Sequence, residues 1–427
     1  MPKLTSRQRV ERTLHHTRPD RVPFDLGGSS VTGMHVSTVY RLRQALELDA
    51  PGTPVKVTRP YLMLGEIGPD LADALSIDVV QLSGTGNMFG LATDAWKEWT
   101  AFDGTPVLVP EAFNSQPESN GDLLQYPQGD LSLSPSARMP AGGWYFDAII
   151  RQEPIDDATL DPAHNLTEFG PISDKELAHY QREAKKLYET TDRAILLKAS
   201  GTGFGDIAAV PGTQLSNPRG IRDVEEWYIS TVTRQEYIRQ VFDTQCGIAL
   251  ANLERIYGVV GNRPSAIYVT GTDFGMQTGP FVSPRMYRAL YQPFHRRLND
   301  WIHTHTSWKT FIHSCGSVVS LIEDFIDAGF DILNPVQCSA AGMNPGELKQ
   351  RFGNRFVFWG GGVDTQKTLP FGTPADVRRE VQERIRAFAP GGGFVFNPIH
   401  NVQPLTPVEN LLAMVDALRE FGGYPLV

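Results

Sequence analysis

Short, almost continuous apolar segments alternate with longer segments of helical periodicity along most of the chain. Apolar segments of this length, bounded by Gly, Pro, Asn and Asp, are typical of buried parallel strands. Eight such strands are predicted, at residues 22–26, 79–84, 194–199, 266–270, 311–315, 332–337, 356–359 and 393–397. Helical patterns occupy residues 5–16, 39–48, 70–75, 174–190, 222–257 and 318–330, and further helices begin at Ser283-Pro284, Thr373-Pro374 and Thr406-Pro407.

Eight strands that each precede a helix predict an α/β protein with a (β/α)8 TIM barrel. A doubly wound open sheet is the rival architecture, in which a strand normally runs into a glycine-rich nucleotide-binding turn. The glycine-rich segment at residues 201–205 lacks the G-x-G-x-x-G spacing and the helix placement of that turn. The barrel is therefore the predicted fold, and residues 1–427 are expected to form a single domain.

The regular alternation is interrupted by residues 96–174. Residues 96–100 and 106–109 flank a turn at Asp103-Gly104, which is typical of a β-hairpin. The remainder of this stretch is rich in Pro, Gly, Ser and Asp and has no sustained periodicity. We interpret residues 96–174 as an insertion on the barrel rim and a candidate lid.

Composition narrows the class of protein. Hydrophobic residues make up 41% of the 427 residues and charged residues 20%, which suits a large buried core. With 39 Lys and Arg against 48 Asp and Glu, the net charge of -9 argues against nucleic acid or an anionic membrane as a partner. No apolar run is long enough to span a bilayer, and the N-terminus has no signal-peptide pattern. Three cysteines in so long a chain favour the reducing cytoplasm.

Polar and reactive side chains follow nearly every predicted strand. They are Asp25, Asp273, Gln277, His313, Cys315, Gln337, Cys338, Asp364, Gln366, Asn397 and His400. Taken singly, each has an ordinary explanation, because Asp25 and Asp364 can cap helices and Cys338 can fill space. The carboxyl ends of barrel strands meet at one mouth, however, and active sites form there. We therefore expect these side chains to converge on a functional site.

His313 and Cys315 carry the most specific chemistry. Side chains alternate along a strand, so these two residues, two positions apart, point the same way. An imidazole and a thiolate side by side provide half of a zinc site, and a catalytic zinc needs a third protein ligand and an open position. Either His400 or Cys338 can reach the same axis, and spacing alone does not choose between them.

The chain resembles the uroporphyrinogen decarboxylase superfamily over most of its length. Residues 18–24 are similar to the family's opening, and Ser283-Pro284 with Tyr287 and residues 406–410 are similar to its helix starts. The decarboxylases of heme synthesis carry an N-terminal Arg-Gln-Ala-Gly-Arg stretch, and nothing like it lies between Phe24 and Tyr40. The chain is more similar to the other branch, the zinc-dependent methyltransferases that work with corrinoid proteins. These include methylcobalamin:coenzyme M methyltransferases and O-demethylase methyltransferases.

The resemblance implies a zinc site. The His-x-Cys of that branch matches His313 and Cys315, and counting back from Thr406-Pro407 places the branch's third cysteine on His400. His in place of Cys keeps a zinc donor and leaves the metal more Lewis-acidic. We expect zinc to be held by His313, Cys315 and His400, with Asn397 and Asn401 as polar neighbours that orient the His400 ring.

The function implied by the resemblance is a zinc-dependent methyltransferase. It would move a methyl group between a small methylated substrate, with a methoxylated compound favoured, and a corrinoid cofactor on a separate protein. Asp273 and Gln277 are expected to orient the substrate at the reacting centre. Asp25, Asp364, Gln337 and Asn397 are expected to bind the rest of it, and a homodimer is compatible with this interpretation.

Two other enzyme classes compete. In a metal-free decarboxylase of a small carboxylated substrate, Asp273 or Asp25 would hold a cationic intermediate and His313 would donate a proton. A glycoside hydrolase would need paired carboxylates, but the strand-end acids are all Asp, with no Glu after the fourth or seventh strand. Zinc at about one per chain would favour the methyltransferase over both.

Overall fold

The computed structural model describes residues 3–426, and its centre is a curved sheet of seven parallel strands. The spatial order is β14-β13-β12-β11-β10-β9-β3, and all six neighbouring pairs are parallel. The strands are β3 (Val79–Ser83), β9 (Ala194–Lys198), β10 (Ala266–Thr270), β11 (Lys309–His313), β12 (Ile332–Asn334), β13 (Val357–Trp359) and β14 (Phe394–Val395). Sequential order with helical crossovers is the topology of a TIM barrel, so the predicted fold class is confirmed.

The first predicted strand, residues 22–26, closes the barrel without forming a regular strand. Phe24 makes a single parallel bridge to Phe396, and its carbonyl accepts a hydrogen bond of 2.7 Å from the amide of Asp78. The segment therefore lies between β14 and β3, in the eighth position. Its pairing is short because Pro23 has no N–H to donate and the chain turns at Gly27, where φ is +92°.

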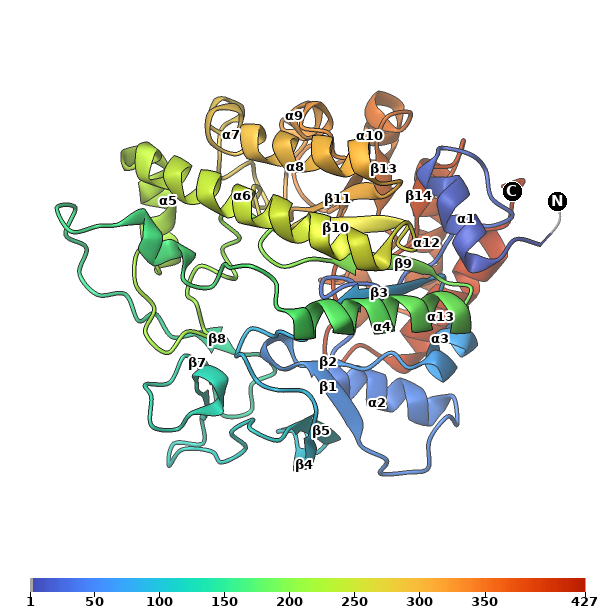
Figure 1. Cartoon of the computed structure of the whole chain (residues 1–427). Coiled ribbons are helices and arrows are strands. Elements are labelled where there is room, and N and C mark those ends of the chain that lie inside the picture. The colour runs from blue at the N-terminus through green and yellow to red at the C-terminus, as the bar shows by residue number, and fades with distance from the viewer. Residues whose placement is uncertain (1–2, 427) are drawn as a thin grey trace.

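Helices cover the outside of the sheet. Figure 1 shows α4, α6 and α8 side by side, and both termini at the end of the molecule where α1 lies. The helices are α1 (Ser6–Leu14), α2 (Val36–Ala45), α3 (Pro69–Leu75), α4 (Asp174–Thr190), α5 (Val224–Thr233), α6 (Gln235–Val260), α7 (Pro284–Leu290), α8 (Gln292–His305), α9 (Ile322–Asp327), α10 (Pro345–Phe352), α11 (Thr368–Phe371), α12 (Pro374–Phe388) and α13 (Val408–Phe421). None of the helices in residues 3–426 combines the length and the apolar character needed to cross a bilayer.

One predicted helix is two. Residues 222–257 were expected to be continuous, but α5 ends and α6 begins at Arg234, whose backbone (φ -128°, ψ 45°) is not helical. The β-branched run Thr231-Val232-Thr233 weakens the helix there, and the Arg234 guanidinium pairs with Asp157 and Glu226.

The barrel interior is a separate buried cluster whose members alternate along the strands. Val79, Ala194, Leu196, Ala266 and Phe311 belong to it, together with Val10 and Leu14 of α1. Helix α1 therefore plugs the amino-terminal end of the barrel. Because every second residue faces inward, the same faces continue toward the carboxyl ends, where polar residues replace the apolar ones.

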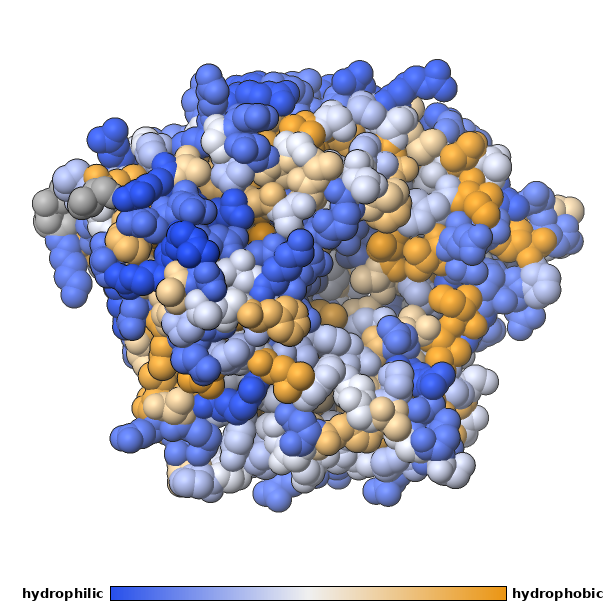
Figure 2. Space-filling view, turned by 180° about the vertical axis from the view of Figure 1, so that it is seen from behind, coloured by the Kyte–Doolittle hydropathy of each residue, from blue (hydrophilic) through white to orange (hydrophobic). Residues whose placement is uncertain are grey.

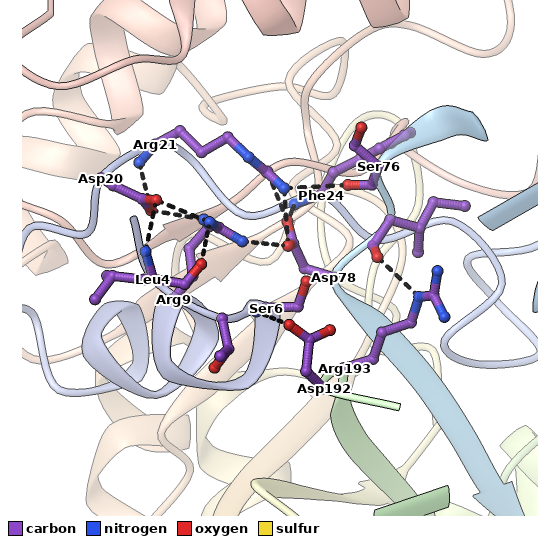
Figure 3. A network of polar contacts seen from close by, with 12 residues as sticks. Leu4, Ser6, Arg9, Asp20, Arg21, Phe24, Ser76, Asp78, Asp192 and Arg193 are labelled. Atoms are coloured by element: carbon purple, nitrogen blue, oxygen red, sulfur yellow. Dashed lines mark hydrogen bonds and ion pairs between the residues drawn. The ribbon is translucent and has the colours of Figure 1, made fainter. Parts of the chain in front are cut away.

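A network of buried charges attaches this plug to the sheet (Figure 3). Arg9 of α1 pairs with Asp20 and Asp78, each at 2.7 Å, and Arg21 pairs with Asp78 at 2.7 Å. Asp78 also accepts a hydrogen bond of 2.8 Å from the amide of Phe24. The carboxylate is fully buried, and these partners satisfy it on the closing segment and on α1 at once.

The predicted hairpin is confirmed as antiparallel β4 (Trp96–Thr100) and β5 (Pro106–Pro110). Strand β5 also pairs in parallel with β1 (Val55–Arg59), which was not predicted, and β1 pairs with β2 (Leu64–Gly65). A second small sheet contains β6 (Leu123–Gln125), β7 (Ala137–Met139) and β8 (Asp147–Ala148). In Figure 1 both small sheets lie away from the two termini. The lid role of residues 96–174 and the single-domain boundary stay predictions.

Candidate functional site

His313, Cys315 and His400 come together at the carboxyl end of the barrel. His313 ends β11, Cys315 follows it by two residues, and His400 lies in the loop after β14. The donor atoms of the three side chains lie within 4.8 Å of one another. The Sγ atom of Cys315 is 3.5 Å from Nε2 of His313, and the two imidazole rings are 5.4 Å apart between centroids.

The donor set and its spacing fit zinc. Zinc–sulfur and zinc–nitrogen bonds of about 2.3 and about 2.0 Å at a tetrahedral angle separate sulfur from nitrogen by about 3.5 Å, and this is the distance between Cys315 and His313. Three protein donors leave one position of the tetrahedron for substrate. Cys338 is not part of this cluster: its thiol lies 3.3 Å from the carbonyl oxygen of Val336.

Asn334 orients the His313 ring. Its Oδ1 lies 2.6 Å from Nδ1 of His313, while its Nδ2 donates a hydrogen bond of 2.8 Å to the carbonyl of Trp359. Nε2, the other ring nitrogen of His313, therefore faces Cys315. The expected role of Asn397 and Asn401 at His400 is not seen: Nδ2 of Asn397 donates to the carbonyl of Asp25, and Asn401 binds the backbone of Ser30 and Gly33. Those bonds tie the β14 loop to residues 22–26, which close the barrel, and to the turn that follows them.

The environment keeps both imidazoles neutral. Burial lowers the pKa of His313 to about 4; the hydrogen bond that His313 donates to Asn334 opposes this shift, and the nearby Lys198 charge adds to it. Burial and the nearby His313 lower the pKa of His400 to about 4. Neutral imidazoles have a lone pair for a metal at physiological pH. Burial and the Asp273 charge raise the pKa of the Cys315 thiol well above its usual range, so a metal would have to displace its proton.

Two predicted residues hold the turn that carries Cys315. Oδ1 of Asp273 accepts a hydrogen bond of 2.6 Å from the amide of Cys315, and Oε1 of Gln337 accepts one of 2.7 Å from the amide of Gly316. Gly316 has φ +83°, and a Cβ there would overlap the backbone of Gly275. Asp273 is thus beside the cluster, and burial raises the pKa of its carboxyl group.

The other predicted residues have different surroundings. Gln277 is exposed, and its backbone carbonyl accepts a hydrogen bond of 2.9 Å from Ala341. Asp25 is fully buried and accepts hydrogen bonds of 2.8 Å from Nε1 of Trp359 and from the amide of Gly28. Asp364 accepts from the amides of Gln366 and Lys367 at the start of α11. Asp25 and Asp364 therefore make structural hydrogen bonds within the protein, and their expected substrate contacts stay predictions.

Sequence reasoning missed further polar groups at this end of the barrel. Asn334 at the end of β12, Lys198 at the end of β9 and Tyr268 of β10 lie on inward faces of the barrel strands. Arg59 ends β1 in the neighbouring small sheet, and its guanidinium reaches Gln81 and Ser83 of β3. Alternation offered a signal, because Lys198 shares a strand face with Ala194 and Leu196, both members of the interior cluster.

Comparisons with known proteins agree with this fold. Residues 265–421 match the family model described as uroporphyrinogen decarboxylase (URO-D), a stretch that includes His313, Cys315 and His400. Uroporphyrinogen decarboxylase of Coxiella burnetii is 27% identical over 89 residues, 20% of this chain and 24% of that protein. The Actinobacillus succinogenes enzyme is 32% identical over 89 residues, again 20% and 24%. The matches thus span about a quarter of the length of these curated relatives.

A solved structure described as a methyltransferase from Methanosarcina mazei shares the fold over nearly the whole chain. It covers 98% of this chain and 99% of its own, with a TM-score of 0.56 and 16% sequence identity. Together these findings confirm the resemblance to the uroporphyrinogen decarboxylase superfamily.

Proposed function

We propose that this protein is a zinc-dependent methyltransferase that moves a methyl group between a small methylated substrate and a corrinoid cofactor. The observation that carries the proposal is the His313, Cys315 and His400 cluster, whose donor spacing suits zinc. A metal-free decarboxylase has no need of two neutral imidazoles and a thiol with converging donor atoms.

The chemistry follows from the residues around the cluster. When bound, zinc would act as a Lewis acid toward the substrate heteroatom, which keeps the electron pair as the methyl group leaves. Asn334 keeps His313 in one tautomer, and Asp273 and Gln337 fix the Cys315 turn. The Asp273 carboxyl, which lies beside the cluster, would orient the substrate and supply the proton that the heteroatom takes up as its methyl group passes to the corrinoid.

We propose that the corrinoid is carried by a separate protein, as the resemblance to the corrinoid-dependent methyltransferases implies. The docking face would be the carboxyl end of the barrel, next to the insertion. Methyl transfer that is equally fast with free cobalamin and with a corrinoid protein would contradict this part of the proposal.

Decarboxylation of a small carboxylated substrate is the second candidate. The matched relatives are uroporphyrinogen decarboxylases, although at 27–32% identity over short segments. In this alternative the cluster would stay metal-free, and His313 would donate the proton that replaces the lost carboxyl group.

Metal analysis combined with a methyl-transfer assay separates the two. The purified chain is expected to hold zinc at about one per chain and to demethylate methoxylated aromatic compounds with reduced cobalamin, followed by its absorbance. Cys315→Ser should lose most of the zinc and the activity, while Cys246→Ser, which alters a thiol outside the cluster, should keep both. A metal-free wild-type chain that releases carbon dioxide from a carboxylated substrate would support the decarboxylase instead.

A further inference from the structure

Two cations lie at the barrel mouth without a carboxylate partner. Nη2 of Arg59 donates hydrogen bonds of 2.9 Å to Oε1 of Gln81 and 3.0 Å to Oγ of Ser83, both uncharged groups. Nζ of Lys198 lies 3.4 Å from Oγ of Ser30 and 4.8 Å from the centre of the Tyr268 ring. Within residues 3–426 neither cation forms an ion pair, although the protein as a whole is acidic.

Both charges are partly withdrawn from water. Burial lowers the pKa of Arg59, and burial together with the nearby Arg59 lowers the pKa of Lys198. The acid that most favours the charged form of Lys198 is Asp206, which is outside ion-pair distance and whose own pKa burial raises to about 6. A desolvated cation without a counter-ion is costly. Two such cations, linked by the bond from Arg59 to Ser83 and by the register of Ser83 with Lys198, are suited to binding an anion.

The cations lie next to the candidate metal centre in the order of the sheet. Ser83 of β3 is in register with Lys198 of β9, and Lys198 is in register with Tyr268 of β10. The Tyr268 ring, which lies beneath the Lys198 ammonium group, is stacked 6.4 Å from the His313 ring between centroids. One aromatic side chain therefore separates Lys198 from His313, a separation that a small molecule can span.

We propose that Arg59 and Lys198 bind a carboxylate of the substrate. The methylated heteroatom of the same substrate would then lie at the His313, Cys315 and His400 cluster. The two cations offer charge-assisted hydrogen bonds to carboxylate oxygens, and Gln81 and Ser83 hold the guanidinium in place. The substrate class is then a small methoxylated carboxylic acid. This inference rests on the proposed function for the methylated end of the substrate. The anion site itself can be tested by binding alone.

The test is calorimetric titration of the purified chain with 3-methoxybenzoate and with its neutral counterpart, 3-methoxybenzyl alcohol. Lys198→Met and Arg59→Met should each weaken the binding of 3-methoxybenzoate by about tenfold or more, and the binding of the alcohol should not change. Lys198→Arg should retain most of the affinity, which separates loss of charge from loss of structure. Lys309→Met is the matched control, because Lys309 lies at the start of β11, at the other end of that strand from His313.

The outcomes separate the two proposals. Wild-type protein that binds both probes equally, or neither, overturns the anion site, and so does a Lys198→Met variant with unchanged affinity for 3-methoxybenzoate. Tighter binding of inorganic phosphate than of the carboxylate overturns the assignment to a carboxylate. Zinc is measured on the same samples: charge-dependent binding by a chain that holds no zinc supports the anion site and contradicts the methyltransferase.

Discussion

Nδ1 of His313 lies 2.6 Å from Oδ1 of Asn334, the residue in register with it on the neighbouring strand β12. The bond from Nδ2 of Asn334 to the Trp359 carbonyl sets the amide orientation, so Oδ1 faces the ring as an acceptor. His313 must then carry its proton on Nδ1, which leaves the Nε2 lone pair for a metal. The pairing of the adjacent strands β11 and β12 thus decides which imidazole nitrogen is available to a metal.

Removal of this orienting bond should weaken the metal site without removing a ligand. Asn334→Ala is expected to lower zinc affinity by about 10- to 100-fold, measured by competition with a chromophoric chelator. The exposed Asn120→Ala, in the insertion, is the control. Unchanged affinity in Asn334→Ala would mean that the ring is held by packing alone.

His400 rather than Cys338 is expected to be the third ligand. His400→Ala should purify largely without zinc and without activity, because one of three donors is lost. Cys338→Ser should keep most of both, because its thiol contacts the Val336 carbonyl outside the cluster. Elemental analysis of zinc in the two variants distinguishes these candidates. Loss of zinc in Cys338→Ser but not in His400→Ala would place the third ligand in the loop after β12.

Asp25 should make the stability of the protein depend on pH. Burial raises the pKa of its carboxyl group to about 6, above its value in the unfolded chain, so the folded state retains the proton longer. The stabilisation is present below the unfolded pKa and is lost as pH rises through about 6. Relative to Asp25→Asn, wild type should lose about 2 kcal/mol between about pH 4.5 and about pH 7.5. Urea denaturation of both proteins measures this, and parallel pH profiles would contradict it.

Asp78 should be critical for stability although it lies far from the metal donors along the barrel. Asp78→Asn leaves Arg9 and Arg21 short of a counter-charge in a buried network, with an expected cost of about 3–5 kcal/mol in the free energy of unfolding. Glu323→Gln breaks an exposed ion pair with Arg355 and should cost at most about 1 kcal/mol. Urea denaturation compares them, and equal losses would show that the network contributes no more than a surface pair.

The sequence by itself determined the barrel and two of the three residues in the candidate metal cluster. Both follow from local rules: apolar runs separated by helical patterns predict the strands, and the period of two places His313 and Cys315 on one face. The position of His400 required the family resemblance, since spacing along the chain did not distinguish it from Cys338. The hairpin at residues 96–110 was also local, and its turn residues predicted it.

Only the tertiary structure decided which polar groups surround those donors. Asn334 reaches His313 because β11 and β12 are paired in a particular register, and Lys198 lies near His313 because β9, β10 and β11 are neighbours in a closed sheet. Asp25 is bonded to Trp359, a residue 334 positions away, and therefore serves closure of the barrel. Periodicity gives the face on which a side chain lies. The partner across the barrel depends on strand register and closure, which arise from contacts distant in sequence.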